Sequence, residues 1–139
     1  MSLRLERTFS ASARTVFDAW LDPEALARFM CPQEGMTTGA IEVDARVGGR
    51  FSITMILGGR ELPHRGEYLA IERYTRLVFT WRSHHAGEGS QVTLMFEALG
   101  PERTRLVLEH VGLEDSAIAA HTHGWTSILA ALDGNVSRT

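Results

Sequence analysis

The sequence predicts an α+β fold in which a curved antiparallel sheet of about seven strands wraps around a long C-terminal helix, with two short helices after the first strand. Three observations predict it: a strand pattern at the start, six further strand patterns between residues 41 and 111, and a helical period in the last segment. An amphipathic helix that follows such a run of strands must lay its apolar face on the sheet.

The chain opens with a strand and then a short helix. Residues 3–9, LRLERTF, alternate apolar and charged side chains, which is the period of a half-buried strand. Ser10 and Ser12 are both candidate N-caps for a helix in residues 13–21, ARTVFDAWL.

A second short helix is predicted directly after the first. Asp22 is an N-cap residue, and Pro23 suits the first helical position because that position needs no backbone N–H donor. The second helix therefore covers roughly 23–29, after a kink. The apolar side chains that this helical pair carries are Trp20, Leu26 and Phe29.

The residue pattern then changes to strands separated by glycines and charged turns. Gly58 and Gly59 indicate a hairpin, since glycine readily adopts the positive φ of two-residue turns. Gly48 and Gly49 predict a bend at a strand start and no phosphate loop, because no lysine follows them. The predicted strands are 41–44, 49–57, 64–72, 76–83, 90–98 and 103–111.

The last element is an amphipathic helix from about Ser116 to Leu132. Advancing 100° per residue, one sector of the helix collects apolar side chains and a histidine, while His123 points to the opposite side. The adjacent histidines of HTHGW therefore do not face each other. The residues of the sheet-facing sector are Ile118, His121, Trp125, Leu129 and Leu132.

Composition narrows the function classes. The chain carries a net charge of −3, and all 14 of its basic residues are arginines. Without lysine, Schiff-base chemistry and a Walker-type phosphate loop are excluded. A mildly acidic chain without a basic block also disfavours nucleic-acid binding. The arginines are scattered along the sequence, which is typical of a solvated surface.

Length and cysteine usage indicate a single domain over residues 1–139. Cys31 is the sole cysteine, so an intrachain disulfide is impossible, and we expect a buried thiol. No apolar run is long enough for a membrane helix and no secretory signal is visible, which favours a cytoplasmic protein with no membrane partner. We expect no cofactor; a homodimer remains an open alternative.

Five stretches in order resemble a known family. The sequence is similar to the START-related helix-grip superfamily (SRPBCC), which shares its fold with the birch-pollen allergen, and within it to bacterial proteins similar to the C-terminal domain of the heat-shock-chaperone ATPase activator. None of the stretches is diagnostic alone, but together they span nearly the whole chain. The matching stretches are 16–30, 47–55, 65–81, 91–113 and 123–136.

The resemblance implies a cavity between the long helix and the sheet, which the superfamily uses for sterols, lipids, polyketides and other hydrophobic molecules. The superfamily includes binding proteins, cyclases and co-chaperones, so the fold does not settle the function. Two departures stand out. The eukaryotic activator has a separate N-terminal domain that this sequence lacks, and residues 29–32, FMCP, replace a Trp-Trp-Gly-Pro run near the expected cavity mouth.

The leading hypothesis is therefore binding of a small hydrophobic ligand in a cavity of about 300 Å³ or more between helix and sheet. Strand alternation places His110 at the end of an inward apolar row, opposite His121. Either histidine is a candidate ligand contact or a satisfied core residue. The predicted ligand-binding residues are Met55, Tyr68, Phe79, Trp81, Leu94, His110, His121 and Trp125.

Other assignments stay open at the level of sequence. Either Tyr68 or Leu69 can face the inside of the sheet, because the alternation of their strand fits both. The side chain of Glu67 is either a buried carboxylate or part of an ion pair on the surface. The adjacent histidines 84–85 favour a turn, and we expect no metal site, although His110, His121 and Glu67 could form a facial triad.

Two alternatives to simple binding remain. The first is a cavity enzyme for proton transfer, hydrolysis or cyclisation that uses His110 or His121 as acid or base, with Tyr68 as a hydrogen-bond donor. The second is a chaperone-linked interaction module, which would require an exposed apolar patch.

Overall fold

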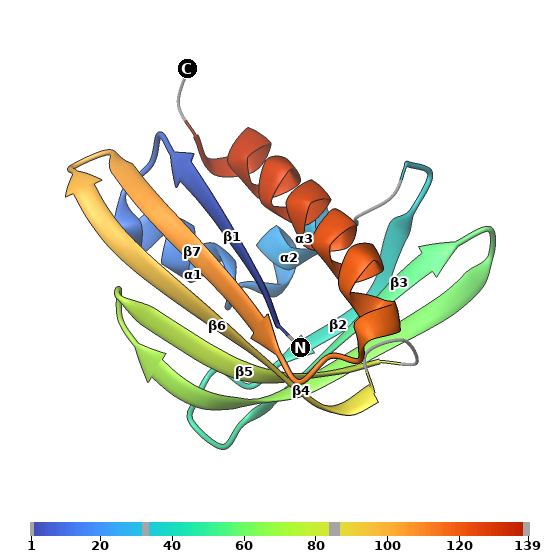
Figure 1. Ribbon diagram of the computed structural model, residues 1–139. Coiled ribbons are helices and arrows are strands. Elements are labelled where there is room, and N and C mark those ends of the chain that lie inside the picture. Colours follow the sequence, from blue (N-terminus) through green and yellow to red (C-terminus); the bar gives the residue numbers. More distant parts are fainter. Residues whose placement is uncertain (1, 32–33, 84–86, 138–139) are drawn as a thin grey trace.

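The computed structural model describes residues 2–31, 34–83 and 87–137, and it has the predicted α+β architecture (Figure 1). A strand is followed by two short helices, six strands and one long helix. The elements are β1 (Ser2–Phe9), α1 (Ala13–Ala19), α2 (Pro23–Phe29), β2 (Thr37–Val43), β3 (Arg50–Leu57), β4 (Arg60–Glu72), β5 (Arg76–Ser83), β6 (Gly87–Gly100), β7 (Arg103–Val111) and α3 (Asp115–Val136).

The seven strands form one curved antiparallel sheet in the order β1-β7-β6-β5-β4-β3-β2. Strands β2 to β7 are a meander, and β1 pairs with β7 over its full length, from Ser2 opposite Val111 to Phe9 opposite Thr104. Helix α3 crosses the concave side of the sheet, where α1 and α2 also lie (Figure 1). The predicted wrapping of sheet around helix is confirmed.

The two short helices begin at side-chain caps. The Ser12 hydroxyl accepts a hydrogen bond from the Thr15 backbone N–H at 3.1 Å, so Ser12 is the N-cap of α1. The Asp22 carboxylate accepts from the Glu24 N–H at 3.0 Å at the start of α2. Both bonds satisfy backbone donors that the first helical turn leaves unpaired.

Helix α3 is longer than its apolar period predicts, extending past Leu132 to Val136. The additional turn carries polar groups, which give no hydrophobic signal. Asp133 accepts from Arg7 Nε at 2.9 Å, and Asn135 donates to the Ala131 carbonyl at 2.7 Å. The first of these contacts fastens the C-terminal end of α3 to β1.

The glycine turns form as predicted. Gly58 and Gly59 join β3 to β4 with φ angles of 60° and 78°, and Gly48 precedes β3 with a φ of 84°. These angles lie in the left-handed region, where a residue without Cβ is not strained.

The inner face of the sheet is set by strict alternation in β3, β5, β6 and β7. At the one ambiguous position, Tyr68 faces inward with 3% of its surface exposed, while Leu69 is 41% exposed. The β4–β5 pairing shifts register between Tyr68 and Ala70, so the local bulge places Leu69 outside. The inward residues on the remaining strands are Phe51, Ile53, Met55, Leu77, Phe79, Trp81, Val92, Leu94, Phe96, Leu106, Leu108 and His110.

Within the described ranges, no helix combines the length and the apolar character that a membrane crossing requires.

Candidate functional site: a cleft between the long helix and the sheet

An open cleft of about 190 Å³ lies between the first half of α3 and the inner face of the sheet. It is smaller than the expected cavity of about 300 Å³. Strand alternation brings Met55, Leu62 and Trp81 to its sheet side, and the helical period brings His121 and Trp125 to the other. Its full lining is Met36, Met55, Leu62, His64, Trp81, Ser83, Ala120, His121, His123, Gly124, Trp125 and Ile128.

Aromatic rings fill most of the space behind this cleft. Trp81 packs against Trp125 with ring centroids 4.9 Å apart, and Phe51 packs edge-on against Phe79 at 5.3 Å. A void of about 10 Å³ remains among them, about the size of one water molecule. One large continuous cavity does not form, because these side chains are too bulky.

The predicted ligand-binding residues are therefore divided by the packing. The cleft is lined by Met55, Trp81, His121 and Trp125. The small void is lined by Tyr68, Phe79 and Trp81, while Leu94 and His110 are fully buried and line neither space. Ligand contact by any of these residues stays a prediction.

His110 is a buried, neutral histidine held by Trp125. The indole Nε1–H of Trp125 donates to His110 Nδ1 at 2.9 Å, so the neutral ring carries its hydrogen on Nε2. His110 Nε2 has no hydrogen-bond partner among the described residues. Burial, followed by the nearby His121, lowers the pKa of His110 to about 3. His110 is thus uncharged near neutral pH.

His121 lies beside His110 and reaches the cleft. The two rings are nearly perpendicular, with centroids 5.2 Å apart. His121 Nδ1 lies 2.9 Å from the Ala117 carbonyl oxygen, which only accepts hydrogen bonds. The Nδ1 atom therefore carries the hydrogen, and Nε2 of the neutral ring presents a lone pair.

The facial triad considered from the sequence is not assembled. Glu67 lies on the outer face of the sheet, whereas His110 faces inward from β7 and His121 lies on α3 beside it. Over the described ranges, no group of three metal-ligating side chains converges. Glu67 is half-buried, so it is not the fully buried carboxylate considered from the sequence. It also forms no ion pair within 4.0 Å among the described residues.

Tyr68 stands apart from the histidines. It packs against Phe51 with centroids 5.3 Å apart, in the wall of the small void. Burial, together with the charge of Asp44, raises the pKa of Tyr68 above the usual range of a phenol. Tyr68 therefore remains a neutral hydroxyl.

Several lining residues were missed at the level of sequence. Leu62 could have been found by extending the inward alternation of β4 backwards from His64, whereas Met36 precedes β2 and carries no periodic signal. His123 is exposed, as predicted, but it also borders the cleft mouth.

The remaining predictions from the sequence concern Cys31 and the histidine pair 84–85. Cys31 is half-buried and not fully buried, and partial burial raises the pKa of its thiol. The histidine pair 84–85 lies outside the described residues.

Comparison with known proteins identifies the family. The model of the family described as Activator of Hsp90 ATPase homolog 1-like protein matches residues 10–137. The chain belongs to this family. The resemblance drawn from its sequence is thereby confirmed, and none of the curated proteins matches the chain.

Solved structures agree with this membership in the Activator of Hsp90 ATPase homolog 1-like family. A Chromobacterium violaceum protein is 30% identical with a TM-score of 0.88, covering 99% of both chains. The AHSA1 protein of Silicibacter pomeroyi is 30% identical with a TM-score of 0.82, covering 97% of this chain and 96% of its own. A Plasmodium falciparum HSP90 activator is 25% identical with a TM-score of 0.72, covering 91% of this chain and 88% of its own.

Proposed function

We propose that the cleft binds a small apolar molecule of one or two rings that carries a hydroxyl group. The observation that carries the proposal is an open hollow between α3 and the sheet with mostly apolar walls and three histidines in its lining, among them His121, whose Nδ1 is hydrogen-bonded to the Ala117 carbonyl. Apolar pockets with a few oriented polar groups are the usual form of small-molecule sites.

The volume of the cleft limits the size of the ligand. At about 190 Å³ it lies below the range of drug-sized pockets, which begins at about 300 Å³. An apolar cavity of about 150 Å³ is known to bind benzene. We therefore expect a compact ligand and not a sterol or a long acyl chain.

The polarity of the cleft sets the ligand's functional group. With its hydrogen committed to the Ala117 carbonyl, neutral His121 accepts at Nε2 and cannot donate there. A ligand hydroxyl can donate to this lone pair. Trp81 and Trp125 offer aromatic walls for the ring of the ligand.

The proposal is tested by calorimetric titration with 1-naphthol and naphthalene, which differ only in the hydroxyl. We expect 1-naphthol to bind about three- to tenfold more tightly, the range of one neutral hydrogen bond. Ala120→Trp would place a bulky side chain in the cleft and abolish binding of both probes. Ala119→Trp is the matched control, because Ala119 is equally exposed on α3 but does not line the cleft.

If neither probe binds, or if the two variants bind equally, the proposal is wrong. Native mass spectrometry of the protein purified from its own source would then reveal whether a different molecule is bound.

Catalysis by His110 is disfavoured by its environment. A general base works best when its pKa lies near the operating pH, and the pKa of His110 is lowered to about 3. Its full burial also separates it from the cleft.

A chaperone-linked role is the second candidate, and it rests on similarity to the Plasmodium falciparum HSP90 activator. Stimulation of the ATPase of an Hsp90-type chaperone from the same organism would support it. An unchanged ATPase rate at saturating protein would refute it.

A further inference from the structure

A second hollow of about 660 Å³ lies on the outer face of the sheet, opposite to α3. Its walls are the outward residues of β3, β4 and β5, which alternate with the buried core positions. Gly66 and Phe51 also belong to the lining, and the buried ring of Phe51 packs on the inner side of Gly66, where a Cβ would overlap it. We call it the outer groove, and its lining is Glu42, Arg50, Phe51, Ser52, Pro63, Arg65, Gly66, Glu67, Thr80, Arg82 and Ser83.

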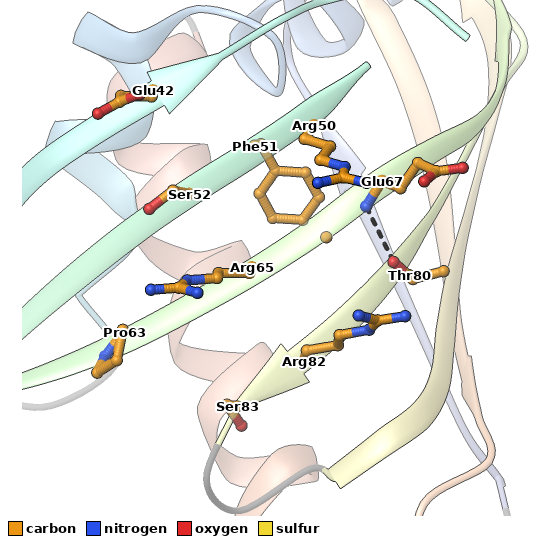
Figure 2. A pocket seen from close by; sticks show the side chains of 11 residues that line it. Glu42, Arg50, Phe51, Ser52, Pro63, Arg65, Glu67, Thr80, Arg82 and Ser83 are labelled. Carbon is orange, nitrogen blue, oxygen red and sulfur yellow. Dashed lines mark hydrogen bonds between the residues drawn. The ribbon is translucent and has the colours of Figure 1, made fainter. Parts of the chain in front are cut away.

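Three arginines from neighbouring strands surround the outer groove. Figure 2 shows Arg50 on β3, Arg65 on β4 and Arg82 on β5, with the helices behind the sheet in this view. Arg65 and Arg82 are direct cross-strand partners, and Ser52 of β3 is opposite Arg65. The sheet register therefore makes direct neighbours of Arg65 and Arg82, which are 17 positions apart in the sequence, and places Arg50 directly opposite Glu67.

These arginines have no ion-pair partner within 4.0 Å in the part of the chain that the structure describes. Arg105, by contrast, pairs with Glu97 at 2.6 Å on the same sheet. Like charges directly opposite each other in a sheet are destabilising. The Arg65 and Arg82 pair thus carries a repulsion that no carboxylate within 4.0 Å relieves among the described residues, as expected where an anion binds.

Neutral donors supplement the charges. The Thr80 hydroxyl oxygen accepts from the Glu67 backbone N–H at 2.9 Å, which leaves the hydroxyl hydrogen of Thr80 able to donate (Figure 2). Ser52 adds a second hydroxyl to the same lining. Guanidinium and hydroxyl groups are the side chains that bind oxyanions in proteins.

The carboxylates at the groove restrict what can occupy it. Glu42 and Glu67 belong to the lining, so the groove carries three positive and two negative side chains. A long acidic polymer would pass these carboxylates and be repelled by them. A small anion can instead be held among the arginines alone, in a hollow whose volume suits a compact organic molecule.

We propose that the outer groove binds a small multivalent oxyanion, a compound bearing phosphate groups or several carboxylates, through Arg50, Arg65 and Arg82. Both groups accept paired hydrogen bonds from the planar guanidinium fork. The site lies on the face of the sheet opposite the apolar cleft. Anion binding in the outer groove does not depend on ligand binding in the cleft.

The test uses pyrophosphate and citrate as probes for the two sources of oxyanion, titrated calorimetrically into the full chain in a phosphate-free buffer. We expect saturable binding of at least one probe. Loss of one charge-assisted hydrogen bond predicts about tenfold or more weaker binding by Arg65→Gln and by Arg82→Gln. Arg103→Gln, at an exposed arginine on β7 with no ion-pair partner within 4.0 Å among the described residues, should leave the affinity unchanged.

The arginine repulsion can also be tested without ligand, from the unfolding temperature of the variants. If the repulsion between Arg65 and Arg82 is real, either glutamine variant should unfold at the same temperature as the wild type or higher. The proposal is overturned if neither probe binds saturably, or if sodium chloride at matched ionic strength removes the binding completely. It is also overturned if Arg103→Gln weakens binding as much as Arg65→Gln and Arg82→Gln do. Binding of a polyglutamate peptide without binding of either small probe would also overturn it.

Discussion

Replacing His110 by glutamine should remove much of the acid sensitivity of this fold. His110 is fully buried and its pKa is lowered to about 3, whereas a histidine in the unfolded chain takes up a proton near pH 6.5. Between these two values the unfolded state binds more protons than the native state. The free energy of unfolding therefore falls as the pH drops below 6.5.

The expected magnitude follows from this difference. Each pH unit below 6.5 costs about 1.4 kcal/mol until the native histidine itself is protonated. Between pH 7.5 and pH 5.0, His110 alone should lower the free energy of unfolding by about 2 kcal/mol. Glutamine does not titrate, and its amide oxygen can accept the Trp125 indole N–H, so the variant isolates the protonation of His110.

The assay is urea unfolding of the wild type and His110→Gln at pH 7.5 and pH 5.0. We expect the wild type to lose about 2 kcal/mol more than the variant between the two pH values. The other histidines are common to both proteins, so their contributions largely cancel. Equal losses in the two proteins would refute the assignment of His110 as a buried neutral group.

Three further predictions concern the same interior. Trp125→Phe should lower the free energy of unfolding by about 1–3 kcal/mol, because it leaves His110 Nδ1 buried without a donor; a loss below about 0.5 kcal/mol in urea unfolding would contradict this. Gly66→Ala should cost about 3 kcal/mol, since its Cβ would overlap a neighbouring backbone carbonyl and a core ring, while Gly89→Ala, with open space around it, should unfold at nearly the wild-type temperature. His121→Phe should abolish the preference for 1-naphthol over naphthalene in calorimetry, and a retained preference would mean that another group binds the hydroxyl.

Periodicity and capping chemistry were sufficient to predict the elements of this fold. The Asp22 cap fixed the start of α2, and the seven strands followed from alternation and glycine turns. The choice between Ser10 and Ser12 required the structure, since both have suitable side chains. Ser12 caps α1, while the Ser10 backbone N–H donates to the Ser137 hydroxyl at the far end of the chain.

The site was less accessible to sequence reasoning because it depends on volumes and register. Alternation correctly placed Trp81 and His110 inside, but it cannot state how much space remains once aromatic rings pack. The bulge beside Tyr68 has no mark in the sequence. The arginines of the outer groove appeared scattered, because only the strand register reveals that Arg65 and Arg82 are neighbours.

The most direct test of the proposed ligand cleft is methyl NMR of the protein titrated with 1-naphthol. Met36, Met55 and Ile128 line the cleft and carry methyl groups, whereas Leu106 is fully buried and lines none of the spaces described above. We expect saturable shifts at the three cleft methyls, little change at Leu106, and no shifts in Ala120→Trp. Shifts that spare the cleft methyls, or that persist in Ala120→Trp, would contradict binding between α3 and the sheet.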